Sequence, residues 1–163
     1  MDMRNIGGNT ATVLLSLLLL CLLSACGGET PEPALSDVVT RIDEAFGNAG
    51  GMMTVDADFI RGSLRMTPDA YAEACVKINA FGANVDEYGV FKGADAAAAK
   101  EIKQAVEAYL QLRVDTWMEA YMPAEKPKVT SAQLVTQGNY VCYAILDEAE
   151  KTAVFEAFEA CFR

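Results

Sequence analysis

Three clusters of carboxylates are the groups in this sequence with the most evident chemical potential. They are Asp56-Ala57-Asp58, Asp86-Glu87 and Asp147-Glu148-Ala149-Glu150. Such acids can ligate calcium, and a pair of them can act as the acid and base of sugar hydrolysis. Asp56 and Asp58 lack the rest of an EF-hand loop, however, and Asp147 with Glu150 has the spacing of a helix cap. We therefore expect structural roles, and assign no catalytic residue and no metal ligand.

Histidine is absent from the chain, and its absence restricts the available chemistry. The usual general base of serine and cysteine hydrolases is missing, as is the commonest nitrogen ligand of zinc and copper. No Ser-x-x-Lys motif replaces it, and Gly47 to Gly51 lacks the lysine and the preceding strand of a phosphate-binding loop. We predict that the protein is not an enzyme and that it carries no cofactor.

The five cysteines fall into two groups. Cys21 and Cys26 belong to the N-terminal apolar segment, whereas Cys75, Cys142 and Cys161 belong to the folded part. Without CxxC spacing a zinc site is not expected, and buried free thiols are the default interpretation. One disulfide stays open as an alternative, and Cys75 with Cys142 is the first pair to test if their strands are neighbours.

Aromatic side chains could form a binding surface or belong to the core. Trp117, Tyr109 and Tyr121 recur at helical spacing, which is more typical of a core than of a ligand groove. Tyr140 and Tyr143 lie on a predicted strand whose faces alternate, so we expect one of them to point away from the helices. If that outer face of the sheet is uncovered, these tyrosines form a candidate surface for a partner.

The N-terminal segment has the features of an export signal. Residues 13–23 read VLLSLLLLCLL, an apolar run shorter than the roughly 20 residues that span a bilayer. Leu23-Ser24-Ala25-Cys26 follows and resembles the lipobox of bacterial lipoproteins, which implies cleavage between Ala25 and Cys26 and lipid, including acyl chains such as palmitate, on Cys26. A simple secretory peptide or a signal anchor is the alternative. The region before the apolar run has little positive charge, because Arg4 is its only basic residue and Asp2 is acidic.

Charge and composition indicate how the mature chain meets the membrane. Residues 1–25 are a predicted signal peptide, residues 26–35 a lipidated tether reaching roughly 30 Å, and residues 36–163 a single domain. The net charge of −10 disfavours nucleic acid and anionic lipid surfaces. We therefore expect the lipid on Cys26 to be the membrane attachment, at the extracytoplasmic face of the cell membrane.

Hydrophobic periodicity predicts three helices and two hairpins in this domain. The helices are expected at 36–46, capped by Ser36, at 94–122, ended by Pro123, and after Asp147. The hairpins are expected at 74–80 with 87–92 and at 132–136 with 140–146, while 47–53 reads as a mobile loop and 67–69 as a short helical turn. The predicted fold is α+β, a two-layer sandwich of an antiparallel sheet made of two hairpins with helices on one face.

Several segments resemble a family of bacterial lipoproteins, found largely in Gram-positive bacteria, that is described only as domain of unknown function 4358. The residues that carry the resemblance are Asn84 to Lys92 before the long helix, Tyr121-Met122-Pro123 after it, and Gly138-Asn139-Tyr140-Val141. It would cover about residues 36 to 162, and it implies no known activity.

Three functions are consistent with these observations. A lipid-anchored binding or accessory module of the cell envelope is favoured, because an anchor is combined with a compact domain that lacks catalytic groups. A carboxylate-dependent envelope enzyme is the alternative, and it predicts two carboxyl groups converging in a cleft. A structural envelope component is the third, and it predicts reversible self-association.

Overall fold

The computed structural model describes residues 31–163 except 48, 82 and 83. Residues 31–163 form one compact unit. The predictions made for the export segment, for its cysteines Cys21 and Cys26, and for cleavage after Ala25 lie outside the described residues. None of the described helices is long and apolar enough to cross a membrane.

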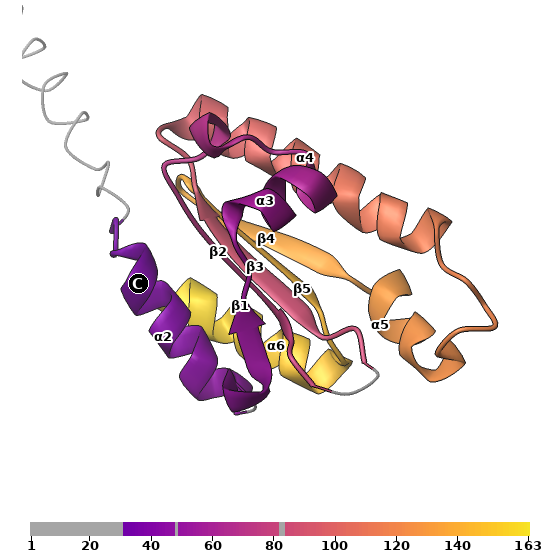
Figure 1. The fold of residues 1–163 in the computed structure, drawn as a ribbon. Helices are drawn as coiled ribbons and strands as arrows, with labels where there is room; N and C mark the ends of the chain where they lie inside the picture. Colours follow the sequence, from indigo (N-terminus) through magenta and orange to yellow (C-terminus); the bar gives the residue numbers. More distant parts are fainter. Residues whose placement is uncertain (1–30, 48, 82–83) are drawn as a thin grey trace, which may run out of the picture. The chain divides into compact units, whose positions relative to one another are not determined.

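A five-stranded antiparallel sheet forms the centre of the domain (Figure 1). Its strands are β1 (Met52–Thr54), β2 (Glu73–Asn79), β3 (Glu87–Lys92), β4 (Gln133–Gln137) and β5 (Tyr140–Ile145), in the spatial order β1-β2-β3-β5-β4. Both predicted hairpins are confirmed, as β2 with β3 and β4 with β5. Strand β1 was not predicted: its glycine-rich surroundings read as a loop, but Met52 to Thr54 pair with Lys77 to Asn79.

Within the described residues, five α-helices accompany the sheet. They are α2 (Leu35–Phe46), α3 (Ala57–Phe59), α4 (Ala96–Asp115), α5 (Lys126–Thr130) and α6 (Glu148–Ala160). The shorter helical segments are the 3-10 turns η2 (Ala49–Gly51), η4 (Pro68–Ala70) and η5 (Pro123–Glu125) and the π-helical turn η3 (Ile60–Leu64). The predicted α+β sandwich on an antiparallel sheet is confirmed. The predicted turn at 67–69 also matches η4.

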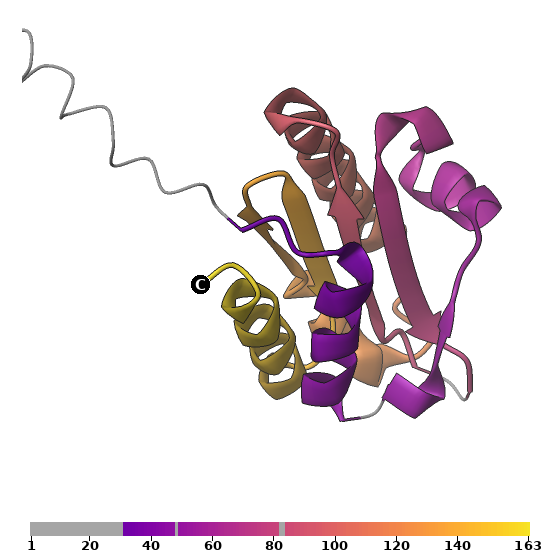
Figure 2. The same cartoon turned by 90° about the vertical axis from the view of Figure 1, so that its left-hand side faces the viewer.

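The helices lie on both faces of the sheet, not on the single face that we predicted (Figures 1 and 2). On one face α2 and α6 cover a core that contains Tyr88, Val90 and Cys142. On the other face α4 and η3 cover a second core that contains Phe91 and Tyr143. The physical reason lies in β5, whose six residues are all buried. A continuous apolar strand cannot present a polar side to water, so both of its faces must be covered.

Local signals set most of the helix ends. Gly47 ends α2 with a φ of 68°, and the Asp147 carboxylate begins α6 by accepting a hydrogen bond from the Glu150 amide at 2.9 Å. The predicted Ser36 cap of α2 is wrong, since Ala34 occupies that position without a side-chain bond. Helix α4 ends at Asp115 instead of Met122. Trp117 leaves the helical path and packs beside the core under α4.

The chain enters the domain at one end of the sheet. The Tyr140 hydroxyl donates a hydrogen bond to the Pro33 carbonyl at 2.5 Å, and the Lys92 ammonium lies 3.6 Å from a Glu32 oxygen. Lys92 and Tyr140 are paired at this end of strands β3 and β5, whereas Glu87 pairs with Ile145 at the other end. The last residues of the predicted tether therefore lie at the end of the sheet opposite to Glu87.

Candidate functional site

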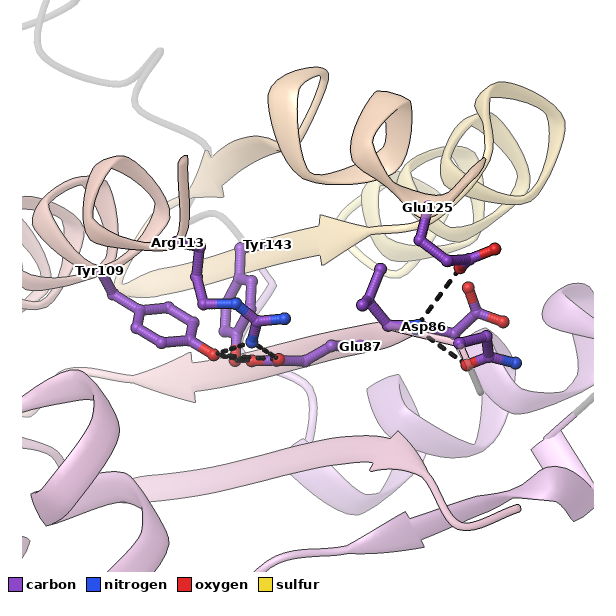
Figure 3. Close-up of polar contacts among 8 residues, drawn as sticks. Asp86, Glu87, Tyr109, Arg113, Glu125 and Tyr143 are labelled. Atoms are coloured by element: carbon purple, nitrogen blue, oxygen red, sulfur yellow. Dashed lines mark hydrogen bonds and ion pairs between the residues drawn. The ribbon is translucent and has the colours of Figure 1, made fainter. Parts of the chain in front are cut away.

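Glu87 is the centre of a buried polar cluster at the start of β3 (Figure 3). Its Oε1 accepts hydrogen bonds from the Tyr143 hydroxyl at 2.6 Å and from the Tyr109 hydroxyl at 2.8 Å. Its Oε2 accepts from the Arg113 guanidinium at 2.8 Å and from Tyr109 at 2.9 Å. Arg113 also donates to the Tyr109 oxygen at 2.7 Å. The carboxylate thus accepts from three side-chain donors, and Tyr109 shares its one hydroxyl proton between the two oxygens.

Strand and helix periodicity bring these side chains together. Alternation along β3 turns Glu87, Gly89 and Phe91 toward α4. On α4, Tyr109 and Arg113 are four residues apart and so lie on one face. Gly89 leaves space for the Tyr143 ring, because a Cβ at residue 89 would lie 2.3 Å from Tyr143 Cε1. The Tyr143 hydroxyl can therefore reach Glu87 across the sheet.

The environment of the cluster changes the acidity of its members. Burial, followed by the charge of Glu87, raises the pKa of both Tyr109 and Tyr143. Burial by itself lowers the pKa of Arg113, but Tyr109 and Glu87 outweigh that effect and raise it. The cluster is therefore a carboxylate-guanidinium pair with two neutral tyrosine donors. In this arrangement each charge has an opposite charge or a hydrogen-bond donor beside it.

Because both tyrosines hold their protons more tightly in the folded state, stability should decrease at alkaline pH. Their contribution is fully present below the unfolded pKa of about 10 and is lost as the pH rises through the higher folded values. Above about pH 10 and below its folded pKa, each tyrosine can lower the free energy of unfolding by up to about 1.4 kcal/mol for each pH unit. Urea unfolding between about pH 8 and about pH 11 measures the slope. Tyr143→Phe should reduce it, whereas Tyr121→Phe, at an exposed position, should not.

A second polar group joins α5 to the start of β3. The Lys128 ammonium lies 2.6 Å from Asp86 Oδ1 and 3.1 Å from Glu125 Oε2. Glu125 Oε2 in turn accepts a hydrogen bond from the Val85 amide at 3.3 Å. Burial lowers the pKa of Lys128, but its bonds to Asp86 and Glu125 outweigh burial and raise it. Lys128 therefore remains a cation between two carboxylates.

A hollow of about 190 Å³ lies between these two polar groups. Its lining combines polar residues, namely Asp86, Glu87, Arg113, Asn79 and Asn84, with the apolar residues Phe59, Ile78 and Val85. Arg113 is the most exposed member of the Glu87 cluster, with 28% of its side chain exposed. The hollow therefore offers hydrogen-bond donors and acceptors to a small polar group.

Comparison with known protein families gives one match. The model of Domain of unknown function (DUF4358) matches residues 45–146. The chain belongs to this family. No curated protein and no solved structure matches it. The matched segment contains every strand, helix α4 and the whole Glu87 cluster, so the candidate site lies inside the DUF4358 domain.

The other two carboxylate clusters identified in the sequence of the DUF4358 chain have local structural roles. Asp56 begins α3 by accepting a hydrogen bond from the Phe59 amide, and Asp58 forms an exposed ion pair with Arg61 at 2.7 Å. Asp147 begins α6, as predicted. Among the residues that the structure describes, no three histidine, cysteine, aspartate or glutamate side chains are placed to hold a metal ion.

The candidate partner surface at Tyr140 and Tyr143 is corrected by the structure. Tyr140 is 1% exposed and faces α2 and α6, while Tyr143 is 0% exposed and faces α4. Helices cover both faces of β5, so neither ring is available to a partner. Tyr143 instead belongs to the Glu87 cluster. This cluster was not predicted from the sequence. The position of Glu87 at the start of an apolar strand could have indicated a buried acid that needs partners.

The disulfide proposed first, Cys75 with Cys142, does not fit the sheet. Both cysteines are opposite Val90, one from β2 and one from β5, so β3 lies between them. Two strand spacings separate their Cα atoms by about 10 Å, beyond the reach of a disulfide. The described cysteines, Cys75, Cys142 and Cys161, are all free thiols. Burial raises the pKa of Cys75 and of Cys142, which disfavours reactive thiolates.

Proposed function

We propose that this protein is a bacterial lipoprotein anchored through Cys26 to the extracytoplasmic face of the cell membrane. Its DUF4358 domain acts there as a binding or accessory module of the cell envelope. The observation that carries this proposal is the position of Leu23-Ser24-Ala25-Cys26 directly after the apolar run of residues 13–23. Two acyl chains on one cysteine would be enough for stable attachment.

The arrangement of the domain supports a binding role. The chain enters beside Lys92 and Tyr140, whereas the hollow at Asp86, Glu87 and Arg113 is at the opposite end of β3. Six residues of strand separate the two ends by about 20 Å. A domain attached at one end would therefore keep this hollow away from its anchoring point and open to a ligand.

Anchoring is tested by lipid labelling of cells that express the full chain. We expect the wild-type chain to take up labelled palmitate, to lose its leader and to fractionate with membranes. Cys26→Ser should lose the label and keep the leader, because the thiol that accepts the lipid is gone. Cys21→Leu is the matched control and should behave as the wild type. Unchanged labelling of Cys26→Ser would refute the anchor.

Binding is tested by placing a photo-crosslinking residue at Asn84, on the rim of the hollow, in intact cells. Lys100, an exposed residue on α4 outside the hollow lining, is the matched control position. We expect a specific adduct from residue 84 that is absent from residue 100. Equal adducts at both positions would argue against a binding role for the hollow.

A carboxylate-dependent envelope enzyme is the alternative, and one observation favours it. Asp86 and Glu87 line the same hollow, as a pair of catalytic acids would. Both carboxylates are nevertheless engaged, Glu87 by Tyr109, Tyr143 and Arg113, and Asp86 by Lys128. Turnover of an envelope glycan by the purified full chain, abolished in Asp86→Asn, would favour the enzyme over the binding module.

A further inference from the structure

Strand β4 is an exposed edge of the sheet without the usual protection. It closes the order β1-β2-β3-β5-β4 and is five residues long, Gln133-Leu134-Val135-Thr136-Gln137. Edge strands normally carry lysine, proline or a bulge, or are very short, because their free backbone groups can pair with another chain. β4 contains neither charge nor proline. The other edge, β1, is only three residues long.

The register with β5 shows which backbone groups of β4 face outward. Gln137 and Tyr140 flank a two-residue turn and form a hydrogen-bonded pair, so Val135 with Cys142 forms the next such pair. The N–H and C=O groups of Leu134 and Thr136 therefore point away from β5, toward the free edge. They are two residues apart and lie symmetrically on either side of Val135.

We propose that β4 pairs antiparallel with β4 of a second copy of this chain. Centring the pair on Val135 sets Leu134 opposite Thr136 of the second copy, so all the outward backbone groups of both strands form hydrogen bonds. The same register sets Gln133 opposite Gln137 and Val135 opposite Val135. No charge meets a like charge across this seam, although the chain carries a net charge of −10.

Helix α6 leaves room for this pairing on its face of the sheet. Helix α6 packs on β5, and three strand spacings of about 4.8 Å would separate it from α6 of the second copy by about 14 Å. On the other face α4 packs on β4 and β5. A groove of about 260 Å³ beside β4 has an apolar wall that includes Leu110, Val114 and Leu134, and a polar part that includes Glu107, Gln111 and Gln133. The added strand would lie along this groove and cover part of its apolar wall. Net charge opposes association, so salt should strengthen the pairing.

For anchored copies the pairing also implies an orientation, and this part rests on the proposed function. The two-fold axis of an antiparallel strand pair is perpendicular to the sheet. Two equivalent membrane anchors require that axis to lie along the membrane normal, so the sheet would lie parallel to the membrane. The chain enters at Pro33 and continues into α2, which places the layer of α2 and α6 toward the membrane.

Disulfide crosslinking of the full chain in cell membranes tests the register. Both cysteine variants are made with Cys142→Ala, because the native Cys142 thiol is opposite residue 135 within the hairpin and could form an intramolecular disulfide. In this background Val135→Cys places two thiols of the paired copies directly opposite each other, within disulfide range. Gln133→Cys is the matched control, because residue 133 is opposite residue 137 and its two copies would be about 13 Å apart. We expect several-fold more dimer from Val135→Cys than from Gln133→Cys, and loss of that dimer when Thr136→Lys is added. Equal crosslinking of both cysteine variants overturns the proposal.

Two measurements separate this proposal from the lipid anchor and from folding defects. Sedimentation of the unmodified full chain in detergent should show dimer that increases with salt, whether or not Cys26 carries lipid. Hydrogen exchange of the Leu134 and Thr136 amides should slow as concentration rises, and it needs no variant. Rapid exchange of both amides at every concentration, together with a monomer in sedimentation, overturns the pairing. This result would not change palmitate labelling, which tests the lipid anchor separately.

Discussion

Glu87→Ala is expected to lower the free energy of unfolding by about 3–5 kcal/mol. The substitution removes the acceptor of Tyr109, Arg113 and Tyr143 together, and leaves the partly buried Arg113 guanidinium without its counter-charge. Urea unfolding of the full chain measures this loss. The urea concentration at the midpoint should fall, while the slope of the free energy of unfolding against urea concentration stays unchanged.

The matched control for this prediction is Asp58→Ala. Asp58 also pairs with an arginine at 2.7 Å, but both side chains are more than half exposed, at 76% for Asp58 and 57% for Arg61. Exposed pairs contribute little, so this substitution should change stability by less than about 1 kcal/mol. Equal losses in the two variants would show that the Glu87 cluster does not hold β3, β5 and α4 together.

Gly89→Ala is expected to lower the free energy of unfolding by about 3 kcal/mol, through overpacking. The new Cβ would lie 2.3 Å from Tyr143 Cε1 and 3.0 Å from Val76 Cγ2. The Tyr143 ring cannot easily move, because it stacks on Phe91 at 6.4 Å between centroids and its hydroxyl is bound to Glu87. Chemical unfolding measures this loss directly.

Two further variants test the overpacking cause of that loss. Gly62→Ala is the control, since a Cβ there meets nothing within 4 Å. It should be neutral or stabilising by up to about 1 kcal/mol. In the double variant Gly89→Ala with Tyr143→Leu, the smaller side chain at 143 should make the combined loss less than the sum of the single losses. Additive losses would argue against a clash with this ring.

Secondary structure was largely readable from short-range patterns. The hairpin around Gly138-Asn139, the Asp147 cap and the stop at Gly47 all depend on neighbours within a few residues. Errors arose where distant contacts decide the outcome. The stretch 52–54 becomes a strand only because β2 offers it an edge, and α4 stops at Asp115 as Trp117 turns toward the core.

The candidate site was less readable than the fold. Asp86-Glu87 was recognised as a pair of acids with an expected structural role, but it was not predicted that Glu87 is 2% exposed. The buried side of α4 runs through Ala99, Ile102, Val106 and Tyr109, so Arg113 extends that side to Glu87. Tyr109 was expected in the core, but its hydroxyl bond to Glu87 was not foreseen.

By itself the sequence determined the family, the α+β class, both hairpins, the end of α2 and the start of α6, because these depend on local periodicity, turn chemistry and caps. Tertiary structure alone decided that helices cover both faces of the sheet, that Tyr140 and Tyr143 are buried on opposite faces, and that Glu87 meets Tyr109, Arg113 and Tyr143. The physical reason is that a buried charge is stable only with partners, and these partners come from residues up to 56 positions away. No local pattern records which strand and helix faces will meet.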